Sequence, residues 1–198
     1  MGRRTYAVAA LAALAAALAV AYAPGGLAAS TPPTIPWSKL PDMQTGPPPW
    51  NAGVRGLTSR LRLLGLSRLS QEGSVLHIHQ HLDLYVNAQK IRLPAFIGID
   101  IGARYITELH THDSTGVIHV ESPTQRAFTL GQVFGEWGVK LTASCVGRYC
   151  GHLRWWVDGH RVSGDPAELI LRAHQEIAIA AGPPPLIVPK SYAFPPGD

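Results

Sequence analysis

The sequence predicts a mainly β fold with one or two short helices, in which antiparallel hairpins form a small sandwich or a barrel-like sheet. Apolar and polar residues alternate over several short segments, and turn-forming pairs such as Asp158-Gly159 separate them. The 17 prolines and a charged fraction of 15% argue against a helical bundle or a long acidic disordered chain. A chain of 198 residues is long enough for one domain with a real core.

The N-terminus predicts an export signal over residues 1–30. Arg3 and Arg4 precede an uncharged run of 18 residues, from Tyr6 to Ala23, which is typical of a signal peptide. This length is at the short end for a membrane span, so an uncleaved signal anchor is the alternative. Both interpretations place the folded part outside the cytoplasm, either secreted or anchored to the outer face of the cytoplasmic membrane. Membrane contact is expected only through an uncleaved segment.

The charge gives no indication of a nucleic-acid partner. Removal of the signal takes two arginines from a formal charge of +4, which leaves about +2. No basic stripe interleaved with aromatic residues follows. The sequence identifies no protein partner.

The chain after the signal divides into a linker and one domain. Residues 31–49 are rich in proline and predict an extended linker, and residues 50–198 predict a single β-rich domain with a proline-rich tail. A short amphipathic helix opens the domain, and we expect its Arg60 and Arg62 on a solvated face.

Two cysteines indicate an oxidising compartment. Cys145 and Cys150 are close in the sequence, and in an exported protein this spacing predicts a local disulfide. A redox pair or a soft-metal site is the alternative.

The first hairpin starts with a strand over residues 75–86. Its apolar face alternates with a polar one, and residues 90–99 are expected to return as a second strand after a turn at Asn87 and Ala88. The polar face carries Val75, His77, His79, His81, Asp83 and Tyr85.

Residues 105–112 and 117–122 predict a second hairpin, whose turn is marked by Asp113 and Gly116. The register that keeps the apolar residues together on a core face places His110 opposite His119. The polar face then carries Glu108, His110, His112, His119 and Glu121. Further along, Thr129 is expected to cap a short helix.

Histidines gathered on two such strands predict a site for a divalent transition metal, Zn²⁺ or Cu²⁺, because imidazole and carboxylate suit these ions. Three alternate residues on one strand span about 13 Å, so the first strand is not expected to give all its histidines to one ion. The predicted ligands are His77, His79, His81, His110, His112 and His119.

Three carboxylates accompany these histidines. Glu121 is expected to orient His119, with direct ligation or proton transfer from metal-bound water as the alternatives. Glu108 is a weaker candidate for the same roles, and Asp113 is expected to act mainly in the turn. The pattern assigns no catalytic residue.

Several segments together resemble an uncharacterised family of exported or membrane-anchored prokaryotic proteins, from about Trp50 to the C-terminus. They are "HIHQHLDLYVN", "LHTHDSTGVIHVESP", "FTLGQVFGEWG", "DGHRVSGDP", "HQEIAIAAG" and "PKSYAFPPG". The resemblance implies export and a single-domain layout, and it implies no established activity. The paired histidines are also similar to those of cupins, but the glycine spacing and the ordered second motif of that fold are missing.

The sequence therefore predicts an exported, histidine-rich protein of the cell envelope that binds Zn or Cu. One alternative is a metal-dependent enzyme, a hydrolase or a copper oxidoreductase, that uses the same histidines. Another is a cell-envelope interaction module that binds no metal. No nucleophile elbow, phosphate loop or dinucleotide fingerprint is present.

Overall fold

A computed structural model describes residues 33–197, which belong to one compact unit. The predicted signal over residues 1–30 lies outside the described residues. The described part is mainly β, with antiparallel hairpins and two short α-helices, which confirms the predicted fold class. Its elements, in chain order, are η1 (Trp37–Lys39), α1 (Leu57–Leu64), β1 (Arg68–Leu69), β2 (Leu76–Val86), β3 (Gln89–Ile91), β4 (Ile99–Asp100), β5 (Tyr105–Thr107), β6 (Leu109–His110), β7 (Val117–Ser122), α2 (Leu130–Trp137), β8 (Cys145–Val146), β9 (Tyr149–Cys150), β10 (Leu153–Val157), β11 (His160–Val162), η2 (Pro166–Glu168) and β12 (Glu176–Ala181).

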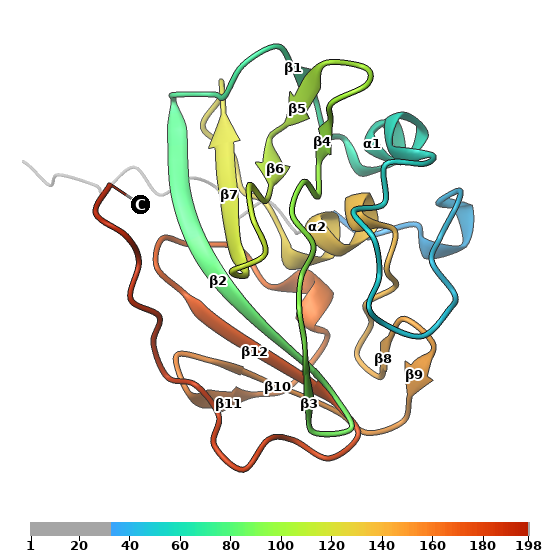
Figure 1. Ribbon diagram of the computed structural model, residues 1–198, viewed down its shortest axis with the longest axis vertical. Coiled ribbons are helices and arrows are strands. Elements are labelled where there is room, and N and C mark those ends of the chain that lie inside the picture. Colours follow the sequence, from blue (N-terminus) through green and yellow to red (C-terminus); the bar gives the residue numbers. More distant parts are fainter. Residues whose placement is uncertain (1–32, 198) are drawn as a thin grey trace, which may run out of the picture. The chain divides into compact units, whose positions relative to one another are not determined.

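The long strand β2 organises the main sheet, whose order is β11-β10-β12-β2-β7-β6, with β3 also paired to β2. The first half of β2 pairs antiparallel with β7, and the second half pairs parallel with β12. The change of partner falls at His81, which is opposite both Val117 and Glu176. Figure 1 shows β2 as a curved ribbon that joins an upper part, with β6 and β7, to a lower part, with β10 to β12.

Local sequence sets the two predicted hairpin turns. Between β2 and β3, Asn87 and Ala88 have φ angles of 49° and 65°. Between β10 and β11, Asp158 and Gly159 have φ angles of 51° and 76°. Two successive left-handed residues match the twist of the flanking strands, so both turns are of the expected kind. The return strand after the first turn is shorter than expected, since β3 ends at Ile91.

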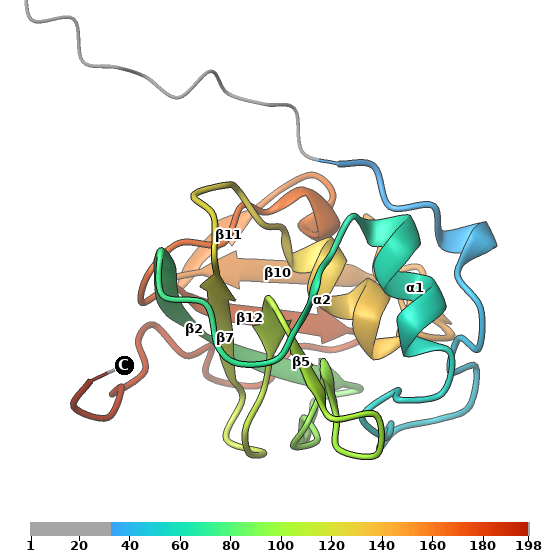
Figure 2. The same ribbon diagram turned by 90° about the horizontal axis from the view of Figure 1, so that it is seen from above.

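Helix α2 packs in the core beside α1, as Figure 2 shows. Thr129 caps it as predicted. The Thr129 hydroxyl accepts a hydrogen bond from the Gln132 backbone, and the Gln132 side chain accepts one from the Thr129 backbone. The whole helix is buried, and the Trp137 ring lies edge-on against Trp50 at 5.7 Å. This packing places α2 behind β6, one of the strands that carry the histidines.

Arg60 differs from the prediction of a solvated face, because it is fully buried while Arg62 is exposed. The Arg60 guanidinium donates hydrogen bonds to the backbone carbonyls of Pro41, Gly53, Arg55 and Glu136. Three of these carbonyls belong to the loops before α1, and that of Glu136 lies in the last turn of α2. The charged side chain therefore acts as a common donor that ties those loops to the end of α2.

The proline-rich segment over residues 33–49 packs on the domain, since Ile35 and Leu40 are buried in the core. This placement differs from the extended linker expected for residues 31–49. The predicted disulfide between Cys145 and Cys150 is present and joins β8 to β9. Among the described residues, no helix is long and apolar enough to cross a membrane.

Candidate metal centre

Pairing of β2, β7 and β6 brings five of the six predicted histidines together on one face of the sheet. His77 lies opposite Glu121, and His79 lies opposite His119. On the other side of β7, His110 lies opposite His119, which is the predicted register. We call His77, His79, His110, His112, His119 and Glu121 the histidine cluster.

Two pairs of imidazole nitrogens converge within the histidine cluster. The Nε2 atoms of His77 and His79 are 3.2 Å apart, and so are those of His110 and His112. Two nitrogens on one tetrahedral zinc ion, with bonds of about 2.0–2.1 Å, lie about 3.3 Å apart. Each pair therefore has the spacing that a shared ion imposes.

Glu121 lies between the two histidine pairs, and its side chain is only 2% exposed. Its Oε1 is 3.1 Å from Nδ1 of His119 and 3.3 Å from Nε2 of His77. Its Oε2 faces Nε2 of His110 at 3.8 Å and has no hydrogen-bond partner among the described residues. Burial acts to raise the pKa of this carboxyl, but the hydrogen bond and charges of the histidines outweigh burial and hold the pKa below its usual value.

His110 is buried and held in a form that can bind a metal. Its Nδ1 lies 3.0 Å from the backbone carbonyl of Thr107, so Nδ1 carries the proton and Nε2 presents a lone pair to the cluster. Burial lowers the pKa of His110 to about 3, although Glu121 acts to raise it. The imidazole is therefore neutral at physiological pH, as metal ligation requires.

The histidine cluster is buried on one side and open to solvent on the other. The side chains of His77 and His112 are 49% and 43% exposed, whereas those of His79 and His110 are almost fully buried. At the open side, the Glu72 carboxylate is 3.3 Å from Nε2 of His112. Glu72 also lines a cavity of about 550 Å³ between the loop before β2 and the strands β4 and β5. Ions and small solutes thus have access to the cluster.

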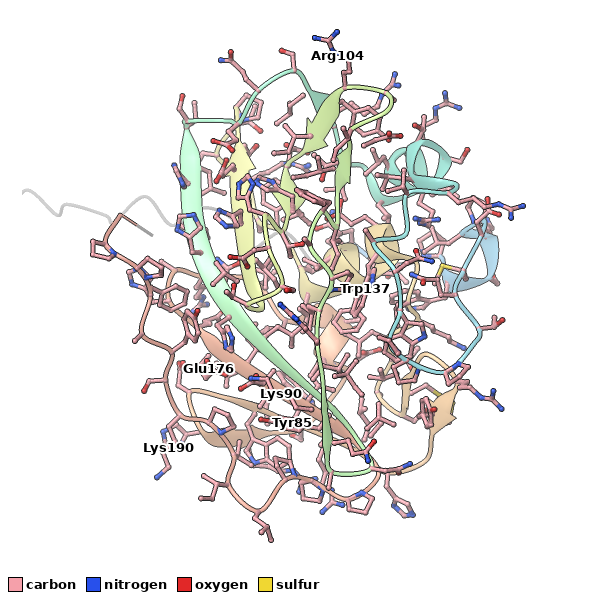
Figure 3. The ribbon with its side chains drawn as sticks, in the orientation of Figure 1. Tyr85, Lys90, Arg104, Trp137, Glu176 and Lys190 are labelled. Atoms are coloured by element: carbon pink, nitrogen blue, oxygen red, sulfur yellow. A yellow bond between two sulfur atoms is a disulfide. The ribbon has the colours of Figure 1, made fainter. Side chains whose placement is uncertain are left out.

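His81 lies apart from the histidine cluster in a second polar group with Asp83 and Glu176. Its Nδ1 is 2.8 Å from the Glu176 carboxylate, and its Nε2 is 3.0 Å from the carbonyl of Thr115. Asp83 forms an ion pair with Lys90. Figure 3 shows Glu176 and Lys90 along the β2–β12 pair, together with Tyr85.

Although His81, Asp83 and Glu176 are close enough to hold an ion, internal partners already occupy both nitrogens of His81. Burial raises the pKa of Glu176, while the hydrogen bond and charge of His81 act to lower it. The ring of Tyr192, from the C-terminal tail, stacks on His81 at 3.9 Å. This group has the features of an internal ion-pair network rather than of an open metal site.

The other two predicted carboxylates lie outside the histidine cluster. Asp113 accepts hydrogen bonds from the backbone and hydroxyl of Thr115, which fixes the turn as expected. Glu108 was expected on the histidine face, but it forms an ion pair with Arg126 and accepts a hydrogen bond from Ser122. The chain bends between β5 and β6, so strict alternation of side chains does not hold at Glu108.

Sequence reasoning missed Glu72, Thr107 and Glu176. Glu72 lies in an irregular loop, and Glu176 reaches His81 through a parallel strand pair far along the chain. Thr107 contributes its backbone carbonyl, which no residue type could have indicated.

The sequence matches no protein-family model, and comparisons with curated proteins and with solved structures give no significant match.

Proposed function

We propose that this protein binds a divalent transition metal, Zn²⁺ or Cu²⁺, at the histidine cluster. One observation carries the proposal. Paired imidazole nitrogens converge beside a buried Glu121, whose Oε2 has no hydrogen-bond partner among the described residues. A buried carboxylate oxygen without a partner is costly, and a bound cation would offset that cost.

The donor set favours Zn²⁺ and Cu²⁺ over other common ions. Imidazole nitrogens predominate, whereas Mg²⁺ and Ca²⁺ prefer oxygen ligands. Only one methionine, Met43, follows Met1, and it lies far from β2 and β7 in the sequence. This composition argues against a methionine-rich Cu⁺ carrier.

We propose further that the protein acts outside the cytoplasm, secreted or anchored to the outer face of the membrane. The disulfide between Cys145 and Cys150 supports an oxidising compartment. The basic and apolar pattern over residues 1–30 supports export.

A metal-dependent enzyme is the second candidate function, and the cavity beside the cluster favours it. Glu72 lines this cavity and its carboxylate is 3.3 Å from Nε2 of His112, so Glu72 connects the cavity to the edge of the cluster. A metal with an open coordination position could activate water there for a hydrolysis, or exchange electrons if it is copper.

Elemental analysis of the protein purified without a histidine tag tests metal binding. We expect zinc or copper in stoichiometric amount, and its loss in the His110→Ala/His112→Ala double variant. The matched control is His152→Ala/His160→Ala, which removes two exposed histidines elsewhere and should keep the metal. Circular dichroism would confirm that both variants fold. If the protein retains no metal and binds neither ion on titration, the proposal is wrong, and the identity of a retained metal separates hydrolytic from redox chemistry.

A further inference from the structure

We infer that the histidine cluster holds two metal ions and that Glu121 bridges them. This inference rests on the proposed function and specifies the stoichiometry and architecture of the same site. Two observations carry it, namely the placement of the histidine pairs on separate strands and the orientation of the Glu121 carboxylate.

The two histidine pairs lie on opposite sides of one strand. His77 and His79 belong to β2, while His110 and His112 lie on and just after β6, and β7 separates β2 from β6. Neighbouring strands are about 4.8 Å apart, so the backbones of the two pairs are about 10 Å apart. Within each pair the Nε2 atoms nevertheless meet at 3.2 Å. Two centres of convergence are therefore present.

The number of donors also exceeds what one ion takes. A single Zn²⁺ is almost always four-coordinate in proteins, whereas the histidine cluster offers five imidazoles and one carboxylate. The donors fall into two sets with Glu121 in common. One set is His77, His79 and Glu121, and the other is His110, His112, His119 and Glu121.

Glu121 has the orientation of a bridging ligand. Its Oε1 lies 3.3 Å and 3.8 Å from the Nε2 atoms of His77 and His79, whereas its Oε2 faces Nε2 of His110 at 3.8 Å. Oε1 also lies 3.1 Å from Nδ1 of His119, which belongs to the second set, so the carboxylate contacts both sets of donors. In proteins with two metals in one site, the ions lie about 3.5–4 Å apart, a separation that one carboxylate spans.

The two proposed metal positions differ in whether the protein fills all four coordination sites. The position at His110 has four protein donors, which is the number that a closed zinc site takes. The position at His77 has three, and His77 is half exposed, so its fourth ligand comes from solvent. Two divalent ions beside neutral imidazoles and one carboxylate leave excess positive charge. That charge favours hydroxide or another oxygen anion as the fourth ligand.

Copper titration with electron paramagnetic resonance tests this inference on the intact, untagged protein. We expect two Cu²⁺ per chain, with a half-field signal from two coupled ions. His77→Ala should bind one ion and lose the half-field signal, and because His77 is half exposed this variant should fold. Glu121→Gln keeps the shape of the side chain but removes its charge, and we expect it to abolish the coupling. The control His160→Ala should retain both ions.

The outcomes separate this inference from the proposed function. One ion per chain, weakened equally by His77→Ala and by His112→Ala, would show a single site and overturn the inference while leaving metal binding intact. Two ions without a half-field signal would overturn the bridge. No bound ion would overturn the proposed function as well.

Discussion

Arg60 offers a direct test of how the loops around α1 are held. Its guanidinium donates to four backbone carbonyls, those of Pro41, Gly53, Arg55 and Glu136. We predict that Arg60→Met, which keeps most of the apolar volume, destabilises the protein because these carbonyls lose their donor.

The expected magnitude follows from the burial of the acceptors. The bonds to Gly53 and Glu136 are buried, and each orphaned carbonyl there costs about 1–3 kcal/mol. The bonds to Pro41 and Arg55 are partly buried, so water can replace the lost donor at lower cost. Burial lowers the pKa of Arg60, which means that the fold disfavours its charge, and removal of that charge offsets part of the loss. We expect Arg60→Met to lower the free energy of unfolding by about 2–4 kcal/mol in total.

Urea unfolding of the metal-free protein measures this loss, with Arg62→Met as the matched control on the exposed face of α1. Arg60→Lys should recover little of the stability lost in Arg60→Met, because an ammonium has three donors and lacks the planar geometry of a guanidinium. If Arg60→Met lowers the free energy of unfolding by less than about 0.5 kcal/mol, which is the range of ordinary surface substitutions, these carbonyls do not depend on Arg60 as their donor.

Three further predictions concern pH and the disulfide. Burial lowers the pKa of His110 to about 3, so the metal-free protein should lose stability as pH falls from 6.5 toward 3, and His110→Asn should flatten this loss in urea unfolding. Burial raises the pKa of Glu136 well above 4.5, so the stability that the protonated carboxyl contributes is lost as pH rises through the raised pKa. In alkaline thermal melts, Glu136→Gln should therefore be more stable relative to the unsubstituted protein. Cys145→Ser/Cys150→Ser opens a loop with a separation of 5 residues, which should cost about 2 kcal/mol in urea unfolding without changing metal content.

Local patterns were sufficient to predict the elements that depend on neighbouring residues. The alternation along β2, the turn at Asp158 and Gly159 and the cap at Thr129 each depend on a few adjacent positions. The register between His110 and His119 could also be predicted, because a slip by one residue would have moved the apolar side chains of β7 out of the core.

Long-range contacts explain what the sequence could not predict. The parallel pairing of β2 with β12 joins residues nearly 100 positions apart, and no local pattern specifies it. Arg60 shares the buried face of α1 with Leu57 and Leu61, and only the arrangement of distant carbonyls makes burial of its charge favourable. Glu108 lies off the histidine face, contrary to the expectation, because the chain bends between the short strands β5 and β6.

The change of strand partner at His81 explains how three alternate histidines on β2 differ in role. His77 and His79 lie where β2 pairs with β7, so they face Glu121 and His119. His81 lies where β12 becomes the neighbour, and Glu176 from that strand takes its Nδ1. The sequence predicted that these three histidines would not share one ion, but it gave no sign of the pairing with β12 that sets His81 apart.

The position of Glu121 between two histidine pairs distinguishes it from the other buried carboxylates. The carboxylate is buried, and its Oε2 has no hydrogen-bond partner within the described part of the chain. Glu176 also has one oxygen without a hydrogen-bond partner in that part of the chain, but its other oxygen bonds to a His81 whose two nitrogens are both occupied. Glu108 is compensated by Arg126 and Ser122. The histidines around Glu121 outweigh burial and hold the pKa of its carboxyl below its usual value, so Glu121 keeps its negative charge inside the cluster. A buried anion between two converging pairs of imidazole nitrogens is the kind of donor set that a divalent transition metal takes, and this arrangement supports the proposed site.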